Sequence, residues 1–167
     1  MDISVIGGTG DEGFGLTLRL ARAGNRVTIG SRIAEKGSAV ADTAREMLGA
    51  GANVDGAANE EAATADVVIV TVPYASQAGT LAQIRDKVGD AVVVDTTVPL
   101  VPPKVMRVQL PAVGCAAIEA QAHLGDGVRL VTAFHNVSAH LLDSDEEIDC
   151  DILVFGDDIE ARKAVIG

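Results

Sequence analysis

Three glycines near the start of the chain have the spacing of a phosphate-binding turn. The G-x-G-x-x-G pattern runs over Gly8, Thr9, Gly10, Asp11, Glu12 and Gly13. In a dinucleotide site the first glycine makes a tight turn, the second lets the backbone approach a pyrophosphate, and the third lets a helix pack closely on a strand. The N–H groups at the start of that helix attract the phosphates. The alternative is a glycine-rich turn without a ligand; a P-loop is excluded because no G-K-S or G-K-T follows.

The residues after the second predicted strand distinguish between two cofactors. About 20 residues past the glycines, an NAD site usually has an acidic residue that holds the ribose hydroxyls, whereas an NADP site has cations for the 2′-phosphate. Here the strand ends in Gly30, Ser31 and Arg32, and Lys36 follows one turn into the next helix. Ser31 offers a hydroxyl and Arg32 a bidentate fork. The pattern favours NADP over NAD; the alternative is that Arg32 and Lys36 are solvated surface cations.

Strands and helices alternate around these residues. Strand patterns lie at 2–7, 26–30, 52–55, 65–73, 90–99, 128–134 and 152–155, and helical patterns at 11–24, 33–49, 75–88, 112–123 and from 158 onward. The continuous apolar runs at 65–73 and 90–99 are typical of parallel strands covered on both faces. Because parallel neighbours need crossover connections, the order predicts an α/β fold. We expect a doubly wound, mostly parallel sheet of the Rossmann NAD(P)-binding type, in a single dinucleotide-binding domain over 1–167.

Composition and net charge limit the classes of molecule that the chain is expected to bind. The chain has 167 residues, 48% of them hydrophobic, and a net charge of −11, which disfavours binding to nucleic acid or to an anionic membrane. No apolar run approaches the ~20 residues of a membrane span. The chain enters a strand pattern without a basic leader segment, so it is predicted to be cytoplasmic. Cys115 and Cys150 are too few and too far apart for a disulfide framework or a zinc site, and no metal is expected.

Several short blocks in a fixed order give the sequence a family resemblance. They are GGTGDEGFG, GSRIAEK, VTVPY, FHNVSA (134–139) and VFGDDIEA (154–161). With these blocks the chain resembles the NADPH-dependent coenzyme F420 reductases, or F420H2:NADP oxidoreductases, which pass hydride between NADP and a deazaflavin. The resemblance implies an oxidoreductase with NADP and coenzyme F420 as its small-molecule partners. It also implies a further strand and helix past Gly167. Whether the protein forms a homodimer is left open by the resemblance.

The resemblance also implies roles for individual residues. Thr9, Ser31, Arg32 and Lys36 would hold the 2′-phosphate, Val72 and Pro73 would line the nicotinamide side, and His135 with Val137 would border the deazaflavin pocket. His135 is the catalytic candidate, because its ring could donate a hydrogen bond to a deazaflavin carbonyl or modulate the charge at N1; the alternative is a structural hydrogen bond. Lys104 and Arg107 are candidates for a second anionic ligand, or else solvated loop charges.

Two other functions remain open from the sequence. One is an NADPH-dependent reductase of a flavin or another acceptor, since the same Rossmann half occurs in ferric reductases. The other is a non-catalytic NADP(H)-sensing module, suggested by the short C-terminal end. In either case the glycine turn and the Ser31 and Arg32 region would serve NADP, and only the second ligand would differ.

Overall fold

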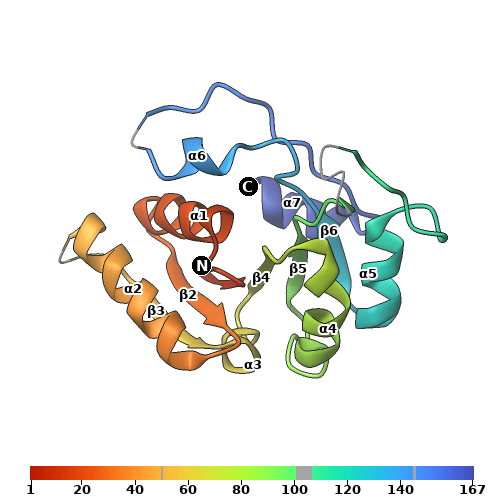
Figure 1. Cartoon of the computed structure of the whole chain (residues 1–167), viewed down its shortest axis with the longest axis horizontal. Coiled ribbons are helices and arrows are strands. Elements are labelled where there is room, and N and C mark those ends of the chain that lie inside the picture. The colour runs from red at the N-terminus through yellow and green to blue at the C-terminus, as the bar shows by residue number, and fades with distance from the viewer. Residues whose placement is uncertain (50, 101–106, 145) are drawn as a thin grey trace.

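In the computed structural model, helices cover both faces of a six-stranded sheet (Figure 1). The structure describes residues 1–49, 51–100, 107–144 and 146–167. The strands are β1 (Asp2–Ile6), β2 (Arg26–Ser31), β3 (Val54–Ala58), β4 (Val67–Val70), β5 (Val92–Asp95) and β6 (Arg129–Thr132). Each is parallel to its neighbours, in the order β3-β2-β1-β4-β5-β6. The predicted doubly wound parallel sheet is therefore confirmed.

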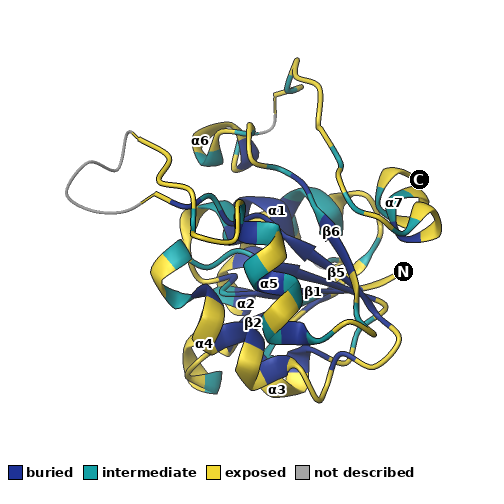
Figure 2. Ribbon diagram, turned by 90° about the vertical axis from the view of Figure 1, so that its right-hand side faces the viewer, coloured by how far each residue is buried: buried dark blue, intermediate teal, exposed yellow. Residues whose placement is uncertain are grey.

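The central strands are buried on both faces, and their side chains alternate between two cores. The helices are α1 (Asp11–Arg22), α2 (Ala34–Leu48), α3 (Asn59–Ala62), α4 (Tyr74–Ile84), α5 (Ala116–Leu124), α6 (Ala139–Leu142) and α7 (Ile159–Ile166). Val68 and Val70 of β4 belong to the core under α3, α4 and α5, whereas Val67 and Ile69 pack on the side of α1, α6 and α7. Figure 2 shows this buried interior between helices whose outer surfaces are exposed.

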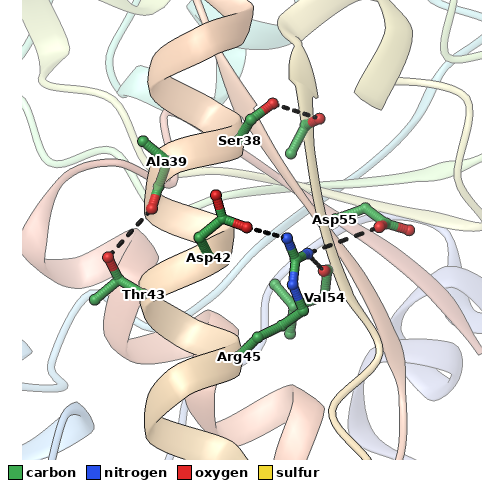
Figure 3. A network of polar contacts seen from close by, with 8 residues as sticks. Ser38, Ala39, Asp42, Thr43, Arg45, Val54 and Asp55 are labelled. Carbon is green, nitrogen blue, oxygen red and sulfur yellow. Dashed lines mark hydrogen bonds and ion pairs between the residues drawn. The ribbon is translucent and has the colours of Figure 1, made fainter. Parts of the chain in front are cut away.

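Helix α2 lies so close to the edge strand β3 that two glycines meet. A Cβ added to Gly56 would overlap the backbone of Gly37, so neither helix nor strand has room for a side chain there. Figure 3 shows the polar contacts beside this point. The guanidinium of Arg45 donates to the Val54 carbonyl and also pairs with a carboxylate on its own helix. These contacts hold β3 at Val54–Ala58, slightly later than the predicted 52–55.

The predicted strand at 152–155 is wrong. Within 152–155, only Phe155 pairs with the sheet through backbone hydrogen bonds, in a single antiparallel bridge with Thr132 of β6, while Ile152 and Leu153 are exposed. One bridge leaves the preceding residues without a ladder of hydrogen bonds, so no strand forms. Helices α3 and α6 were not expected, because four residues are too few to show helical periodicity.

Neither of the two cysteines forms a disulfide bond. Cys115 is half-buried and Cys150 exposed, and both are free thiols. Among the described residues, no helix combines the length and the apolar character needed to cross a membrane.

A buried carboxyl group ends the central strand β5. Asp95 is 1% exposed, and its Oδ1 accepts hydrogen bonds from the backbone N–H (3.2 Å) and the hydroxyl (2.6 Å) of Thr97. The Nε2 of Gln77, a buried residue of α4, donates to Oδ2 over 2.5 Å. Burial raises the pKa of Asp95, and the hydrogen bonds from Thr97 and Gln77 offset part of that increase. The carboxyl group thus fixes the chain just beyond β5 and ties it to α4.

We expect the replacement Asp95→Asn to change how stability depends on pH. A carboxyl group whose pKa is raised by folding stabilises the fold below its ordinary pKa of 3.8, and this contribution is lost as pH rises through the raised value. The free energy of unfolding of the wild type should therefore fall relative to that of the variant over this range. Urea denaturation at several pH values measures the difference. Asp86→Asn, at an exposed carboxylate, is the control, and parallel curves for wild type and Asp95→Asn would contradict the prediction.

Candidate active site

A cavity of about 470 Å³ opens at the carboxyl ends of β1, β2 and β4. The strand order reverses at β1, and open α/β sheets bind their ligands at such a switch point. Seven of the predicted site residues line the cavity, namely Thr9, Gly10, Ser31, Arg32, Lys36, Val72 and Pro73. The remaining lining residues are Gly7, Ile33, Asn59, Thr71, Ser76 and Thr80. The structure therefore brings the predicted phosphate-binding and nicotinamide-side residues together in one place.

The turn between β1 and α1 leaves no room for a side chain at Gly7, Gly8 or Gly13. Gly7, which precedes the predicted motif, has a φ of +78° and donates its N–H to the Gly30 carbonyl over 3.0 Å. A Cβ on Gly13 would lie 2.5 Å from Oγ1 of Thr71 and 2.7 Å from Cα of Gly8. Gly8 and Gly13 are consequently buried beneath the turn and do not line the cavity, whereas Thr9 and Gly10 do.

The start of α1 adjoins the cavity and offers backbone donors. Gly10 is the N-cap and provides no side-chain cap, and the first helical hydrogen bond runs from the Phe14 N–H to the Gly10 carbonyl over 2.8 Å. The N–H groups of Asp11, Glu12 and Gly13 precede this bond and have no acceptor within the helix. Free N–H groups and the helix dipole make this end of α1 attractive to an anion.

Two cations face solvent at the cavity without a partner. Arg32 and Lys36 are exposed, and neither side chain forms an ion pair or a hydrogen bond with any residue that the structure describes. Ser31 is buried, and its hydroxyl oxygen accepts the Ile33 N–H over 3.2 Å, which holds the chain where it leaves β2. In a chain with a net charge of −11, unpaired cations in one cavity create a local site for an anionic ligand.

The two acidic residues of the motif differ in their surroundings. Asp11 is exposed, whereas Glu12 is partly buried and shares a hydrogen bond with the hydroxyl of Thr96 beyond β5. Desolvation raises the pKa of Glu12, and the Thr96 hydroxyl offsets part of the increase. Neither side chain lines the cavity, so their backbone N–H groups are what they present to an anion there.

The site includes residues that sequence reasoning missed. Asn59 begins α3 and is 2% exposed, and its Oδ1 has no hydrogen-bond partner among the described residues. Because α3 is too short to be predicted, the sequence did not show that Asn59 lies directly after a strand. Thr71 donates its hydroxyl to the Ile6 carbonyl over 3.0 Å and so joins β4 to β1. Its place at the end of an apolar run was the signal that could have identified it.

His135 and Val137 lie beyond β6, outside the described lining of the cavity. They belong to a turn closed by the Val137 N–H and the Phe134 carbonyl over 3.2 Å. His135 is exposed as a residue, yet neighbouring protein removes part of the hydration of its ring and lowers its pKa. Because β6 is parallel to the other strands, this turn follows the same edge of the sheet as the cavity. Arg107 is exposed, and Lys104 lies outside the described residues.

The residues present suit a phosphorylated dinucleotide. The cradle at Gly13 would be filled by any Cβ, the start of α1 offers backbone donors, and the side chains of two cations have no partner in the described part of the chain. Asn59 adds a buried oxygen that still needs a donor. The start of α1 and the two cations can bind negative charge, and the oxygen of Asn59 can accept a hydrogen bond from a donor group of the ligand. A nucleotide with an additional phosphate requires both.

Two curated relatives resemble nearly the whole chain. The F420-dependent NADP reductase of Methanothermobacter thermautotrophicus is 47% identical in an alignment of length 168 that covers 96% of this chain and 72% of the relative. The F420-dependent NADP reductase of Methanocaldococcus jannaschii is 42% identical in an alignment of length 174 that covers 99% of this chain and 77% of the relative. The chain thus spans about three quarters of the length of these relatives.

Solved structures share the fold. A protein from Sinorhizobium meliloti superimposes with a TM-score of 0.76 at 24% identity, over 98% of this chain and 76% of that protein. A pyrroline-5-carboxylate reductase from Coxiella burnetii gives a TM-score of 0.56 at 21% identity, over 83% of this chain and 45% of the reductase. At these identities the likeness concerns the fold alone.

More than half of the chain matches one protein family. Residues 2–99 match the family described as NADP oxidoreductase, coenzyme F420-dependent. This match covers the glycine turn, the cations after β2 and the end of β4, which together form the cavity. With the two curated relatives, it shows that the chain belongs to the family of F420-dependent NADP reductases.

Proposed function

We propose that this protein transfers a hydride between NADP(H) and the deazaflavin coenzyme F420, using the cavity at the carboxyl edge of its sheet. The observation that carries the proposal is the pair of unpartnered cations, Arg32 and Lys36, at a cavity that also receives the start of a helix. A 2′-phosphate needs such cations, and an NAD site would have an acidic residue in their place. Membership of the reductase family supports the same assignment.

In this proposal NADP lies across the switch point of the sheet. Thr9, Ser31, Arg32 and Lys36 hold the 2′-phosphate end, and the turn of Gly8, Gly10, Asp11, Glu12 and Gly13 receives the pyrophosphate through its backbone. Gly8 and Gly13 act indirectly, because they let the turn and the helix approach the sheet. Val72 and Pro73, at the end of β4, border the nicotinamide.

The chain contributes orientation rather than a strong acid or base. The two bound cofactors supply the hydride chemistry, which needs their flat rings stacked with the donor and acceptor carbons close together. Val72 follows just after β4, and its carbonyl lies 3.4 Å from the hydroxyl oxygen of Thr97, whose proton is donated to Asp95. Asp95 in turn holds Thr97, so the ring-binding end of β4 is braced by the buried carboxyl group of β5.

His135 and Val137 are assigned to the deazaflavin. The lowered pKa keeps the imidazole neutral near pH 7, so the ring presents one N–H donor and one acceptor nitrogen. A neutral donor suits a hydrogen bond to a ring carbonyl of the deazaflavin. Val137 packs against the core beneath β6 and so gives the turn a fixed base.

A homodimer stays a prediction. The side of β6 away from β5 pairs only with Phe155 among the described residues, and apolar side chains are exposed beside it. These are Leu153, Phe155 and Ile159. An open strand edge flanked by apolar surface is the face that a second copy would cover.

The replacement Arg32→Ala should weaken binding of NADPH by about 10- to 100-fold, because a charge-assisted hydrogen bond to a phosphate is lost. Binding of NADH, which lacks the 2′-phosphate, should change by about twofold or less. Titration of nicotinamide fluorescence measures both affinities. Arg85→Ala, at an exposed arginine that ends α4, is the control for loss of charge. Equal losses for the two nucleotides would refute the phosphate assignment.

Mixing the protein with NADPH and oxidised F420 should bleach the deazaflavin absorbance. FAD and FMN, offered separately under the same conditions, should be reduced more slowly. Turnover with a flavin but not with the deazaflavin would identify a flavin reductase instead. Tight NADPH binding without reduction of any of the three acceptors would favour a sensing module, and each of these two results would contradict the proposed acceptor.

The replacement His135→Asn should remove a pH dependence without abolishing binding. In the wild type, protonation of the imidazole at pH values below its lowered pKa should alter the affinity for F420. The asparagine variant keeps a donor and an acceptor but does not titrate, so its affinity should stay constant across this range. Quenching of deazaflavin fluorescence from pH 5 to pH 8, roughly the range over which histidine titrates, measures both proteins. Identical profiles would assign His135 a structural role.

A further inference from the structure

One arginine of α1 binds the chain segment that follows β6. The guanidinium of Arg19 donates to backbone carbonyls at the end of α6 and just beyond it. The Nε donates to the Leu142 carbonyl over 2.9 Å. The two N–H groups of one terminal nitrogen are shared among the carbonyls of Leu141 (2.9 Å), Ser144 (2.6 Å) and Glu146 (2.8 Å). Segments more than 120 residues apart in the sequence are thereby joined at a single side chain.

Helix α6 lies directly on α1, as Figure 1 shows. A Cβ on Gly15 of α1 would overlap the side chain of Leu142, which is itself 4% exposed. The missing side chain at Gly15 therefore sets the distance between the helices, and Arg19 lies one turn further along the same helix. Close approach and hydrogen bonds together fix α6 in one position.

The other end of the segment is constrained as well. Phe134 has a φ of +67°, a conformation that costs a bulky side chain free energy and persists only where the surroundings hold it. Its ring and Val137 pack on the core beneath β6. The Nδ2 of Asn136 donates to the Asp151 carbonyl over 2.6 Å. His135 therefore lies in a turn whose two flanks are anchored, on one side by Phe134 and on the other by the segment that Arg19 holds.

Arginine suits this position for a geometric reason. Its planar fork can reach several carbonyls at once, whereas a lysine ammonium is a single point charge. Within the described part of the chain, Arg19 pairs with no carboxylate, so the carbonyls at the end of α6 are its partners. A cation at a helix C-terminus is also favoured by the helix dipole, although α6 is short.

We propose that Arg19 is a positioning residue for the second substrate: by holding the backbone of Leu141, Leu142, Ser144 and Glu146 over α1, it sets the place of the turn that carries His135 and Val137. This inference rests on the proposed function, in which that turn borders the deazaflavin. It also gives α1 two tasks at opposite ends. The start of the helix receives the dinucleotide, and its last turns hold the segment that positions the turn beside the other ring.

The test compares Arg19→Lys and Arg19→Ala with the wild type in the full chain. F420 affinity is measured by quenching of deazaflavin fluorescence, NADPH affinity by nicotinamide fluorescence, and the mobility of residues 134–146 by amide hydrogen exchange. Both variants should bind F420 about tenfold more weakly or worse, because lysine keeps the charge but loses the fork. Exchange should quicken in 134–146, while NADPH affinity should change by about twofold or less. Arg85→Ala is the matched control for removing one arginine charge.

Three results would overturn the inference. The first is unchanged F420 affinity in Arg19→Lys together with faster exchange, which would mean that the position of the segment does not matter for the second substrate. The second is a parallel loss of NADPH and F420 affinity, which would make Arg19 a residue of general stability. The third is a wild type that binds NADPH but not F420; it defeats the proposed function itself and is recognised before any variant is compared. Should Arg19→Ala fail to fold, Arg19→Lys decides alone.

Discussion

Close contact between the start of α1 and the end of β4 is the constraint on which the rest of the site depends. Gly13 lies against Thr71 with no space for a side chain, and Thr71 in turn bonds to the end of β1. This contact sets where the helix starts relative to three strand ends. The cavity, the free N–H groups of the first turn and the direction of α1 all follow from it. A side chain at Gly13 would shift the helix, and everything that the helix carries would move with it.

In the proposed arrangement the direction of α1 matters, because both ligand sites depend on this helix. Thr9 and Gly10, directly before its first turn, line the cavity, and its later turns meet α6 at Gly15 and Arg19. Gly15 sets the distance between α1 and α6, and Arg19 sets the orientation of α6 on α1. A rigid helix between two ligand sites is a simple way to keep two flat rings in register, which hydride transfer requires.

Charge distribution explains how an acidic chain can take an anionic ligand. The net charge of −11 repels phosphates at long range, yet the side chains of Arg32 and Lys36 at the cavity have no partner among the described residues, while other cations, such as Arg45 and Arg26, pair with nearby carboxylates. Leaving two cations free has no benefit for the fold alone. Their availability therefore points to a ligand, and the absence of an acidic residue after β2 indicates which nucleotide it is.

The sequence by itself determined the sheet, the glycine turn and the cations, because each depends on residues close together in the chain. Apolar runs such as 65–73 identify buried strands, and the spacing of Gly8, Gly10 and Gly13 indicates a tight turn between a strand and a helix. Only the tertiary structure decided the rest. Gly7 takes the left-handed turn ahead of the motif, Asn59 enters the cavity from a helix too short to predict, and 152–155 makes one bridge instead of a strand. Arg19 looked like any helical arginine, since its partners lie more than 120 residues away and come together only when the chain folds.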